Sequence, residues 1–186
     1  TTNNNDFKVE NHTVTAGSLE PVTFNPTADA FVRGGSFAES KYGTNTTLEV
    51  KSDNNVSYQR KSYLKFNFSS IPGSTVQSAI LRVYVNATEG DASTIKLYGN
   101  ATESWVESSI TWNNAPAETT YIGSINISAA SGTWYEIDVK NYVNDNMSDK
   151  IVSFELLNDG APTSGNKAIF NSREAASNKP ELVIIP

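Results

Sequence analysis

The sequence contains no cysteine and only one histidine, and this shortage excludes several kinds of metal and catalytic site. Without cysteine the chain has no disulfide and no thiolate metal site. The single histidine, His12, lies in a polar segment near the N-terminus, where we expect it to be solvated. One histidine does not make a histidine-rich zinc site or, unaided by its neighbours, a Ser-His-Asp triad.

Long apolar runs and an excess of basic charge are also missing. No run of about 18 apolar residues occurs, so we expect no membrane insertion, and no signal-peptide pattern opens the chain. The 14 Lys+Arg residues are outnumbered by 20 Asp+Glu residues, which gives a net charge of -6. A field of this sign repels nucleic acid, so we expect no nucleic-acid partner.

Short runs in which apolar and polar residues alternate are abundant, and they predict β-strands. The clearest pair lies on either side of the turn at 71–74. Leu64, Phe66 and Phe68 share one face of the first strand. Alternate residues from Ala79 to Val85 share one face of the second. Similar runs recur to the end of the chain, so the sequence predicts an all-β fold, a two-sheet β-sandwich or jelly roll of about ten strands.

The remaining segments define the domain organisation. With 186 residues the chain is long enough for one buried core and short for two, so we predict a single domain over residues 22–186. Residues 1–21 are polar and are interpreted as a linker or an edge strand. Residues 140–148 lack strand alternation, and Tyr142, Val143 and Met147 there indicate one short helix.

Strand parity sorts the basic residues. Five fall on the side of their strands that faces away from the core: Arg33, Lys51, Lys65, Arg82 and Arg173. Cations gathered in a protein of net negative charge would form a local site for carboxylate or sulfate groups. Outward lysines and arginines are also the ordinary covering of a sheet, and parity does not say which sheet a strand joins.

Polar and aromatic side chains accompany these cations. Asn171, next to Arg173, adds an amide for sugar hydroxyls, and Tyr63, like Tyr84, offers a ring on which a sugar can pack. Trp105 and Trp112 lie in an irregular stretch and have two interpretations. They either plug the open end of the sandwich or stack on sugar.

Several segments in the same order resemble a known family. They are ADAFVRGGS, KYGTNTTLEVK, YLKFNFSSIPG, SAILRVYV, ITWNNAP, GTWYEIDV and FNSREA with PELVI. Together they resemble the DNRLRE or disaggregatase-related domain, which is similar to the carbohydrate-binding modules of alginate lyases. The resemblance covers about residues 22–186. It implies a non-catalytic module of a larger multidomain protein, extracellular or on the cell surface, that binds acidic, uronate-containing polysaccharide.

The residues support no independent enzymatic site. No spacing singles out a pair of carboxylates of the kind that glycosidases use. Tyr63 near Lys65 resembles the catalytic pair of a polysaccharide lyase, in which one group is the base and the other neutralises the uronate carboxylate. A lyase or disaggregating activity therefore stays a minor alternative. The other function that stays open is a structural or adhesive surface-layer domain that packs against neighbouring domains.

Calcium is the expected cofactor, in a structural role, because it suits the oxygen-rich loops of an extracellular sandwich. Asp29 is the first candidate ligand, since it faces away from Ala28 and Ala30 and the family pattern places an acidic residue there. Asp138 is the second. Each of the two carboxylates has an alternative role in capping a turn or pairing with an arginine. Asn-x-Ser/Thr triplets fit a secreted chain; they begin at Asn11, Asn45, Asn55, Asn67, Asn86, Asn100, Asn126 and Asn146.

Overall fold

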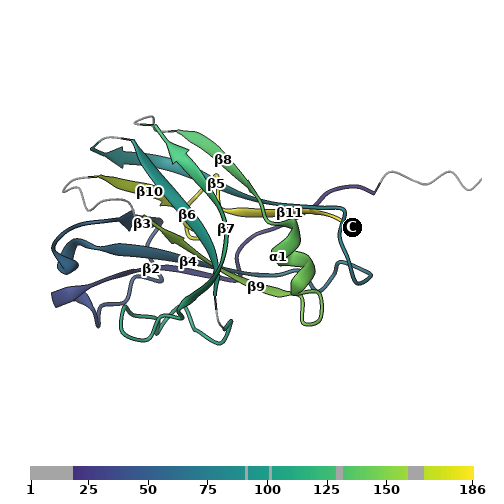
Figure 1. Ribbon diagram of the computed structural model, residues 1–186, viewed down its shortest axis with the longest axis horizontal. Helices are drawn as coiled ribbons and strands as arrows, with labels where there is room; N and C mark the ends of the chain where they lie inside the picture. The colour runs from purple at the N-terminus through teal and green to yellow at the C-terminus, as the bar shows by residue number, and fades with distance from the viewer. Residues whose placement is uncertain (1–18, 91, 101, 129–131, 159–165) are drawn as a thin grey trace, which may run out of the picture.

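The computed structural model describes residues 19–90, 92–100, 102–128, 132–158 and 166–186, and strands dominate it (Figure 1). The strands are β1 (Val22–Phe24), β2 (Ala28–Arg33), β3 (Thr47–Lys51), β4 (Arg60–Asn67), β5 (Ser78–Glu89), β6 (Ser93–Asn100), β7 (Glu118–Ile127), β8 (Thr133–Asp138), β9 (Ile151–Leu157), β10 (Lys167–Asn171) and β11 (Glu181–Ile185). The helical elements are η1 (Gly35–Phe37), η2 (Val56–Tyr58) and α1 (Lys140–Asp145). The predicted linker is outside this description up to residue 18, and β1 begins at Val22.

The eleven strands are linked into one curled sheet, in which neighbours along the main path run β1-β11-β5-β10-β3-β4-β9-β6-β7. β2 pairs with β4 and β8 pairs with β5, and the pairings are antiparallel. The link between β3 and β4 is a single residue pair, Lys51 with Arg60. The all-β prediction is confirmed, whereas a jelly roll of two separate sheets stays a prediction.

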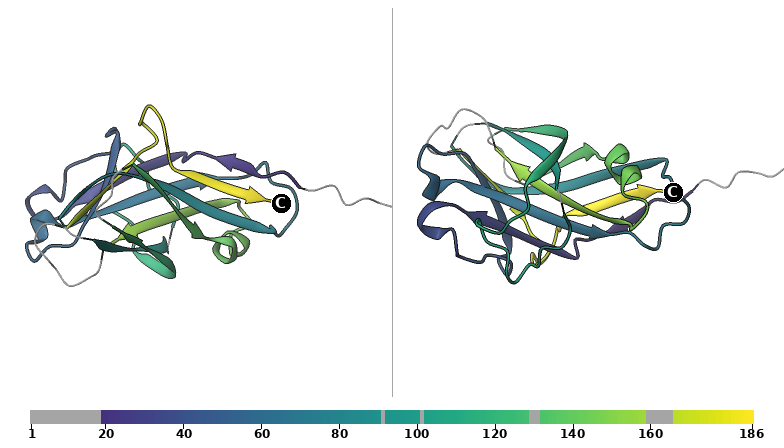
Figure 2. Two further views of the ribbon diagram at one scale, coloured as in Figure 1. Left: turned by 90° about the horizontal axis from the view of Figure 1, so that it is seen from above. Right: turned by 60° about the horizontal axis from the view of Figure 1, so that its bottom comes forward.

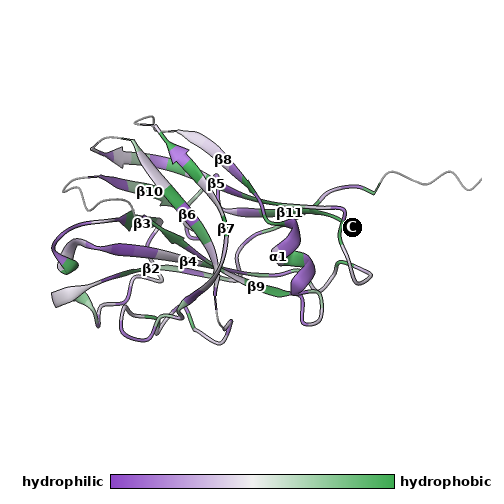
Figure 3. Ribbon diagram, in the orientation of Figure 1, coloured by the Kyte–Doolittle hydropathy of each residue, from purple (hydrophilic) through white to green (hydrophobic). Residues whose placement is uncertain are grey.

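The main core lies inside the curl, because strands from both halves of the sheet point alternate side chains into it. In β5, Ala79, Leu81, Val83 and Val85 are each 0% exposed, while the residues between them are partly exposed. The hydropathy of the ribbon alternates in the same way along the strands (Figure 3). Phe66 and Phe154, from the neighbouring strands β4 and β9, belong to the same cluster. The predicted alternation is confirmed for β4 and β5.

A second, smaller cluster lies on the opposite face of β2 and β4. Irregular residues 102–117, between β6 and β7, supply Trp105 and Ile110 to this cluster, and Tyr63 is 1% exposed there. Figure 2 shows this segment on the outside of the strands. Trp105 is therefore buried in the fold, but against the outer face of β2 and β4 and not at the open end of a sandwich. The expectation that Tyr63 offers its ring to a ligand is wrong, because this segment covers the outer face of β4.

The helix prediction is confirmed in α1, which is shorter than the segment from which it was predicted. Tyr142, Val143 and Met147 form the expected apolar stripe against the main core. The ring of Tyr142 lies so close to Gly99 of β6 that a Cβ there would meet it at 2.2 Å. A side chain at position 99 would therefore displace the helix. Among the described residues there is no helix that combines the length and the hydropathy needed to cross a membrane.

Replacing Phe154 should cause a large loss of stability. Its ring is fully buried and lies 6.1 Å from the ring of Phe66 and 5.4 Å from that of Tyr142, measured between centroids. Because Phe154→Ala leaves a cavity there, we expect the free energy of unfolding to fall by about 3–5 kcal/mol in chemical denaturation. Tyr121→Ala, at a residue that is 54% exposed, is the control. A loss below about 1 kcal/mol for Phe154→Ala would contradict this packing.

The two clusters should unfold together. Leu64 and Phe66 belong to the main core and Tyr63 to the second cluster, so β4 carries both. Neither cluster can lose its packing while the other keeps β4 in place. We therefore expect one cooperative calorimetric transition for the chain, and two well-separated transitions would show that the clusters are independent.

Candidate functional site

The structure does not bring the five predicted cations to one groove. Arg82 lies on β5 and pairs with Glu136 of β8 and Glu181 of β11, at 3.0 Å from the carboxylate of Glu136. Its guanidinium also stacks on Trp134, 4.6 Å from the ring centroid. Arg82 is therefore held by side chains of its own neighbourhood and shares no contact with the other four.

Lys65 is enclosed by the segment that covers β4. Its Nζ donates hydrogen bonds to the carbonyl oxygens of Glu103 and Trp105, at 2.7 and 2.6 Å. The same Nζ lies 4.6 Å from the ring centroid of Trp105, and burial lowers the pKa of the amine. Two of the three donors of Lys65 are thus occupied in fixing residues 102–117 to the sheet. A ligand would have to compete with these contacts.

Asn171 also has an internal role. It is 8% exposed, and its Nδ2 donates to the carbonyl oxygens of Ser177 and Asn178 at 3.0 and 3.3 Å. It borders a hollow of about 440 Å³ that Tyr84 also lines. Asn171 therefore shapes the turn after β10, and its amide nitrogen already has partners.

Arg33 and Lys51 are the two predicted cations that share a neighbour. The Cζ of Arg33 lies 3.4 Å from the ring centroid of Phe37 and 5.6 Å from that of Tyr58. The Nζ of Lys51 lies 5.2 Å from the Tyr58 ring. This grouping lies where β2 and β3 end and β4 begins, at the left in Figure 1. Phe37 and Tyr58 are 36% and 46% exposed, so both rings face solvent beside a cation.

A hollow of about 200 Å³ lies next to this grouping, and Lys51, Arg60, Lys61 and Trp112 line it. The Nζ of Lys61 is 5.6 Å from the Trp112 ring centroid. We call the whole surface the basic end. It comprises Arg33, Phe37, Lys51, Tyr58, Arg60, Lys61 and Trp112.

Acidic neighbours partly balance the cations of the basic end. Lys51 pairs with Asp53 at 3.0 Å and Arg60 with Glu49 at 2.8 Å. Lys61 lies 3.0 Å from the buried carboxylate of Glu155, whose pKa burial raises. Arg33 differs from these three. Its Nε donates to the carbonyl oxygen of Ser57 at 2.7 Å, and no acidic side chain among the described residues pairs with it.

Several residues of the basic end were missed from the sequence. Lys61 has the parity of Tyr63 and Lys65 in β4, so the same rule would have selected it. Arg60 has the opposite parity, that of the core-facing Leu64 and Phe66, so the rule does not select it, although its side chain pairs with Glu49. Tyr58 comes from η2, which gives no alternating pattern. No sequence signal places it beside Arg33.

A group of three carboxylates forms a second site. Asp29, Glu107 and Glu174 each offer an oxygen atom, and these atoms lie within 4.8 Å of one another. They come from β2, from the covering segment 102–117 and from the turn after β10. Arg173 contributes one cation, with Nη1 at 3.0 and 2.9 Å from the two oxygens of Glu107. The sequence selected Asp29 and Arg173 but not Glu107 or Glu174.

Asp29 is the buried member of this group. It is 1% exposed, contrary to the outward position expected from parity. Its Oδ2 accepts a hydrogen bond from the backbone N–H of Arg173 at 2.7 Å. Its Oδ1 is buried and accepts no hydrogen bond from a described residue. Burial raises the pKa of Asp29 to about 8, and the charges of Glu174 and Glu107 act in the same direction.

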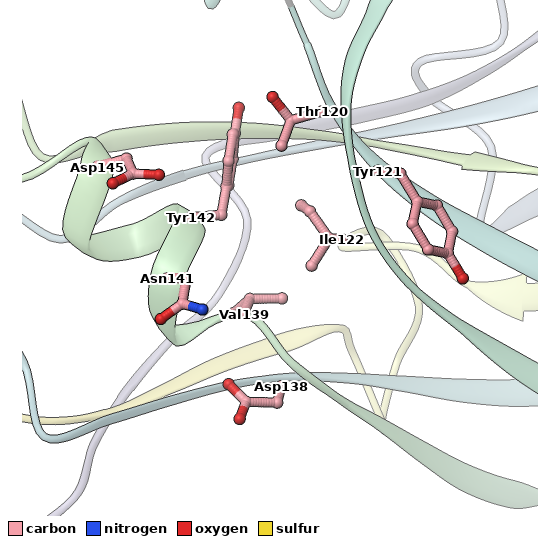
Figure 4. Close-up of a pocket in the computed structure, with 8 residues that line it drawn as sticks. All are labelled: Thr120, Tyr121, Ile122, Asp138, Val139, Asn141, Tyr142 and Asp145. Atoms are coloured by element: carbon pink, nitrogen blue, oxygen red, sulfur yellow. The ribbon is translucent and has the colours of Figure 1, made fainter.

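Asp138, the second predicted metal ligand, lies apart from this group. It is exposed at the end of β8, and its Oδ1 accepts from the backbone N–H of Lys140 at the start of α1. Asp138 therefore has the turn-capping role that the sequence offered as the alternative to metal binding. Asp138 also borders a hollow of about 330 Å³ between β7 and α1, where Asn141, Asp145 and Tyr121 lie (Figure 4).

The family model of carbohydrate-binding modules, family 96, matches residues 20–186. This defines the class of protein as a carbohydrate-binding module. The chain belongs to carbohydrate-binding module family 96. The narrower likeness to DNRLRE or disaggregatase-related domains stays a prediction.

The chain is also similar to one curated protein and, weakly, to one solved structure. A gellan lyase from Bacillus sp. is 26% identical over 173 residues, which are 91% of this chain and 7% of the lyase. The chain therefore spans a small part of that relative. A solved structure of latent aurone synthase, a polyphenol oxidase, covers 83% of this chain and 28% of its own, with 11% identity and a TM-score of 0.32. A likeness this low carries no inference.

Lys65→Ala should lower stability, because the variant leaves the carbonyl oxygens of Glu103 and Trp105 without their charged donor. Hydrogen bonds of this kind contribute about 1.5–3 kcal/mol each. We expect the melting temperature to fall by roughly 5 °C or more in a thermal melt. The exposed Lys41→Ala is the control. An unchanged melting temperature for Lys65→Ala would free Lys65 for the ligand-binding role that its parity predicted.

Proposed function

We propose that this module binds an acidic, uronate-containing extracellular polysaccharide at the basic end, and that it targets or anchors a secreted or cell-surface protein there. Membership in a carbohydrate-binding family indicates that the ligand is a carbohydrate. The acidic character of the ligand, the surface that binds it and the anchoring role are the parts that we infer.

The guanidinium of Arg33 is the observation that carries the proposal. It is stacked on Phe37 and positioned by Ser57, and no acidic side chain of the described residues neutralises it. A guanidinium fixed in this way presents its remaining N–H groups to solvent in a set direction. Such an edge suits the two oxygens of a carboxylate, which it can bind in a bidentate manner. A neutral sugar offers no equivalent partner.

The surroundings of Arg33 suit a chain of sugars. Tyr58 is 46% exposed and lies within reach of both Arg33 and Lys51, so a ring stands between two cations. An aromatic face packs on the C–H face of a sugar while the cations bind its acidic group. The hollow beside Lys61 and Trp112 extends this surface and has room for a further group. Because the net charge of the protein is -6, the basic end is a local group of cations in a field that is otherwise negative.

The relative gives independent support for an acidic ligand. Its name makes gellan, an acidic polysaccharide, the polymer on which that lyase acts. The chain matches a small part of it, which is consistent with a module attached to a larger secreted protein. We further propose that the module itself is not catalytic.

The test is the affinity for soluble polyglucuronate, measured by isothermal titration for the wild type, Arg33→Ala and Tyr58→Ala. A charge-assisted hydrogen bond is worth about 1.5–3 kcal/mol, so we expect Arg33→Ala to weaken binding about tenfold or more. The affinity of the wild type should fall as salt is raised from 50 to about 500 mM, because salt screens exposed charges. A neutral glucan of the same length should bind poorly.

Arg82→Ala is the matched control. It also removes an arginine that stacks on an aromatic ring, but from strands that carry no residue of the basic end. It should leave the affinity unchanged. Equal binding of the neutral glucan, or a normal affinity in both Arg33→Ala and Tyr58→Ala, would refute the proposal.

A packing module is the competing function, and one observation favours it. Phe37, Val56 and Tyr58 expose apolar surface at the same end of the molecule. Apolar side chains of this kind also suit contact with a neighbouring domain. The titration separates the two functions, since a packing surface has no reason to prefer polyglucuronate to glucan.

A further inference from the structure

The carboxylate group of Asp29, Glu107 and Glu174 has the composition of a cation site. Hard oxygen ligands from three separate segments converge there. Two oxygens on opposite sides of one calcium ion are about 4.6–5.2 Å apart, twice the length of a calcium–oxygen bond. The three oxygens lie within 4.8 Å of one another, a separation of the size found between ligands of one ion.

A buried oxygen without a partner is the independent sign of a missing ligand. Asp29 Oδ1 belongs to a side chain that is 1% exposed, and it accepts no hydrogen bond from a described residue. Leaving such an acceptor unpaired is unfavourable, and native proteins rarely do so. Its partner oxygen Oδ2 is already held by the backbone N–H of Arg173, which fixes the direction of the carboxylate.

The charges of the group also leave a place for a divalent ion. Three carboxylates oppose one guanidinium, that of Arg173, which contacts Glu107 closely and Glu174 at 3.5 Å. In an ion-bound state with all three carboxylates ionised, the sum is minus three plus one, or minus two. A doubly charged cation would balance it.

The surrounding backbone holds the ligands in place. Ser172 Oγ accepts a hydrogen bond from the backbone N–H of Glu174 at 3.1 Å and donates its own hydrogen to the carbonyl oxygen of Asn45 at 2.6 Å. Gly43 packs directly on Glu107, since a Cβ at Gly43 would lie 2.3 Å from its carbonyl oxygen. The loop before β3 can approach the site only because position 43 has no side chain.

We infer that Asp29, Glu107 and Glu174 bind one calcium ion, which joins β2 and the turn after β10 to the covering segment 102–117. The role is structural. The ion would tie the segment that shields β4 to the sheet beside its Lys65 contact, since Asp29 lies opposite Leu64 in the pairing of β2 with β4, and Lys65 and Glu107 line one hollow. This site is distinct from the basic end, and it does not depend on the function proposed there.

Calcium titration of the whole chain tests this inference. The protein is treated with EDTA, exchanged into chelator-free buffer, and titrated with CaCl₂ in a calorimeter. We expect one ion per chain. At calcium 100-fold above the dissociation constant, the melting temperature should rise by about 5–10 °C. MgCl₂ should bind at least tenfold more weakly, because magnesium demands a stricter octahedral geometry.

Two variants and one control assign the site. Glu174→Gln keeps the shape of a partly exposed side chain and removes one charged ligand, and Asp29→Asn removes the buried one. Both should weaken calcium binding at least tenfold. Glu136→Gln is the matched control, since Glu136 is likewise paired with an arginine but lies on β8.

The inference is overturned if the wild type shows neither heat nor a thermal shift with CaCl₂. It is also overturned if Glu174→Gln and Asp29→Asn both respond like the wild type. In either case Arg173 alone serves as the counter-ion. An equal response to MgCl₂ would reject calcium as the ion.

Discussion

The burial of β4 on both of its faces is the constraint on which the rest of the molecule depends. Leu64 and Phe66 face the main core, while Tyr63 and Lys65 lie beneath residues 102–117. A strand covered on both sides needs a fixed cover as well as a sheet. The hydrogen bonds from Lys65, the indole of Trp105 against Ser153 Oγ at 2.8 Å, and Glu107 at the carboxylate group fix that cover at successive points.

The alternation of apolar and polar residues predicts side-chain burial correctly where a strand has one solvent-exposed face, and it fails where both faces are covered. The alternation of Leu81 and Val83 with Arg82 predicts β5 correctly, because the far side of β5 meets solvent or charged neighbours. The same rule turns Tyr63 and Asp29 outward, where the structure buries them. Nothing in residues 102–117 shows from composition that they fold over β2 and β4.

The candidate site is harder to predict than the fold, because it gathers side chains from segments without a repeating pattern. Arg33 was selected from its parity, and its isolation from acidic groups became visible only in three dimensions. Tyr58 reaches it from η2, a turn of three residues. Glu107 and Glu174 are both far from Asp29 in the sequence, so their approach follows from the fold rather than from any local spacing.

The pairing of β1 with β11 determines how the module is presented. Val22 lies opposite Ile184, so the first and last strands meet at one end of the molecule, at the right in Figure 1. The basic end lies at the other, and a strand as long as β4 spans roughly 25 Å. The two terminal strands therefore lie at the end of the molecule opposite the surface formed by Arg33 and Tyr58. A further domain joined to the chain at either end would therefore leave that surface exposed.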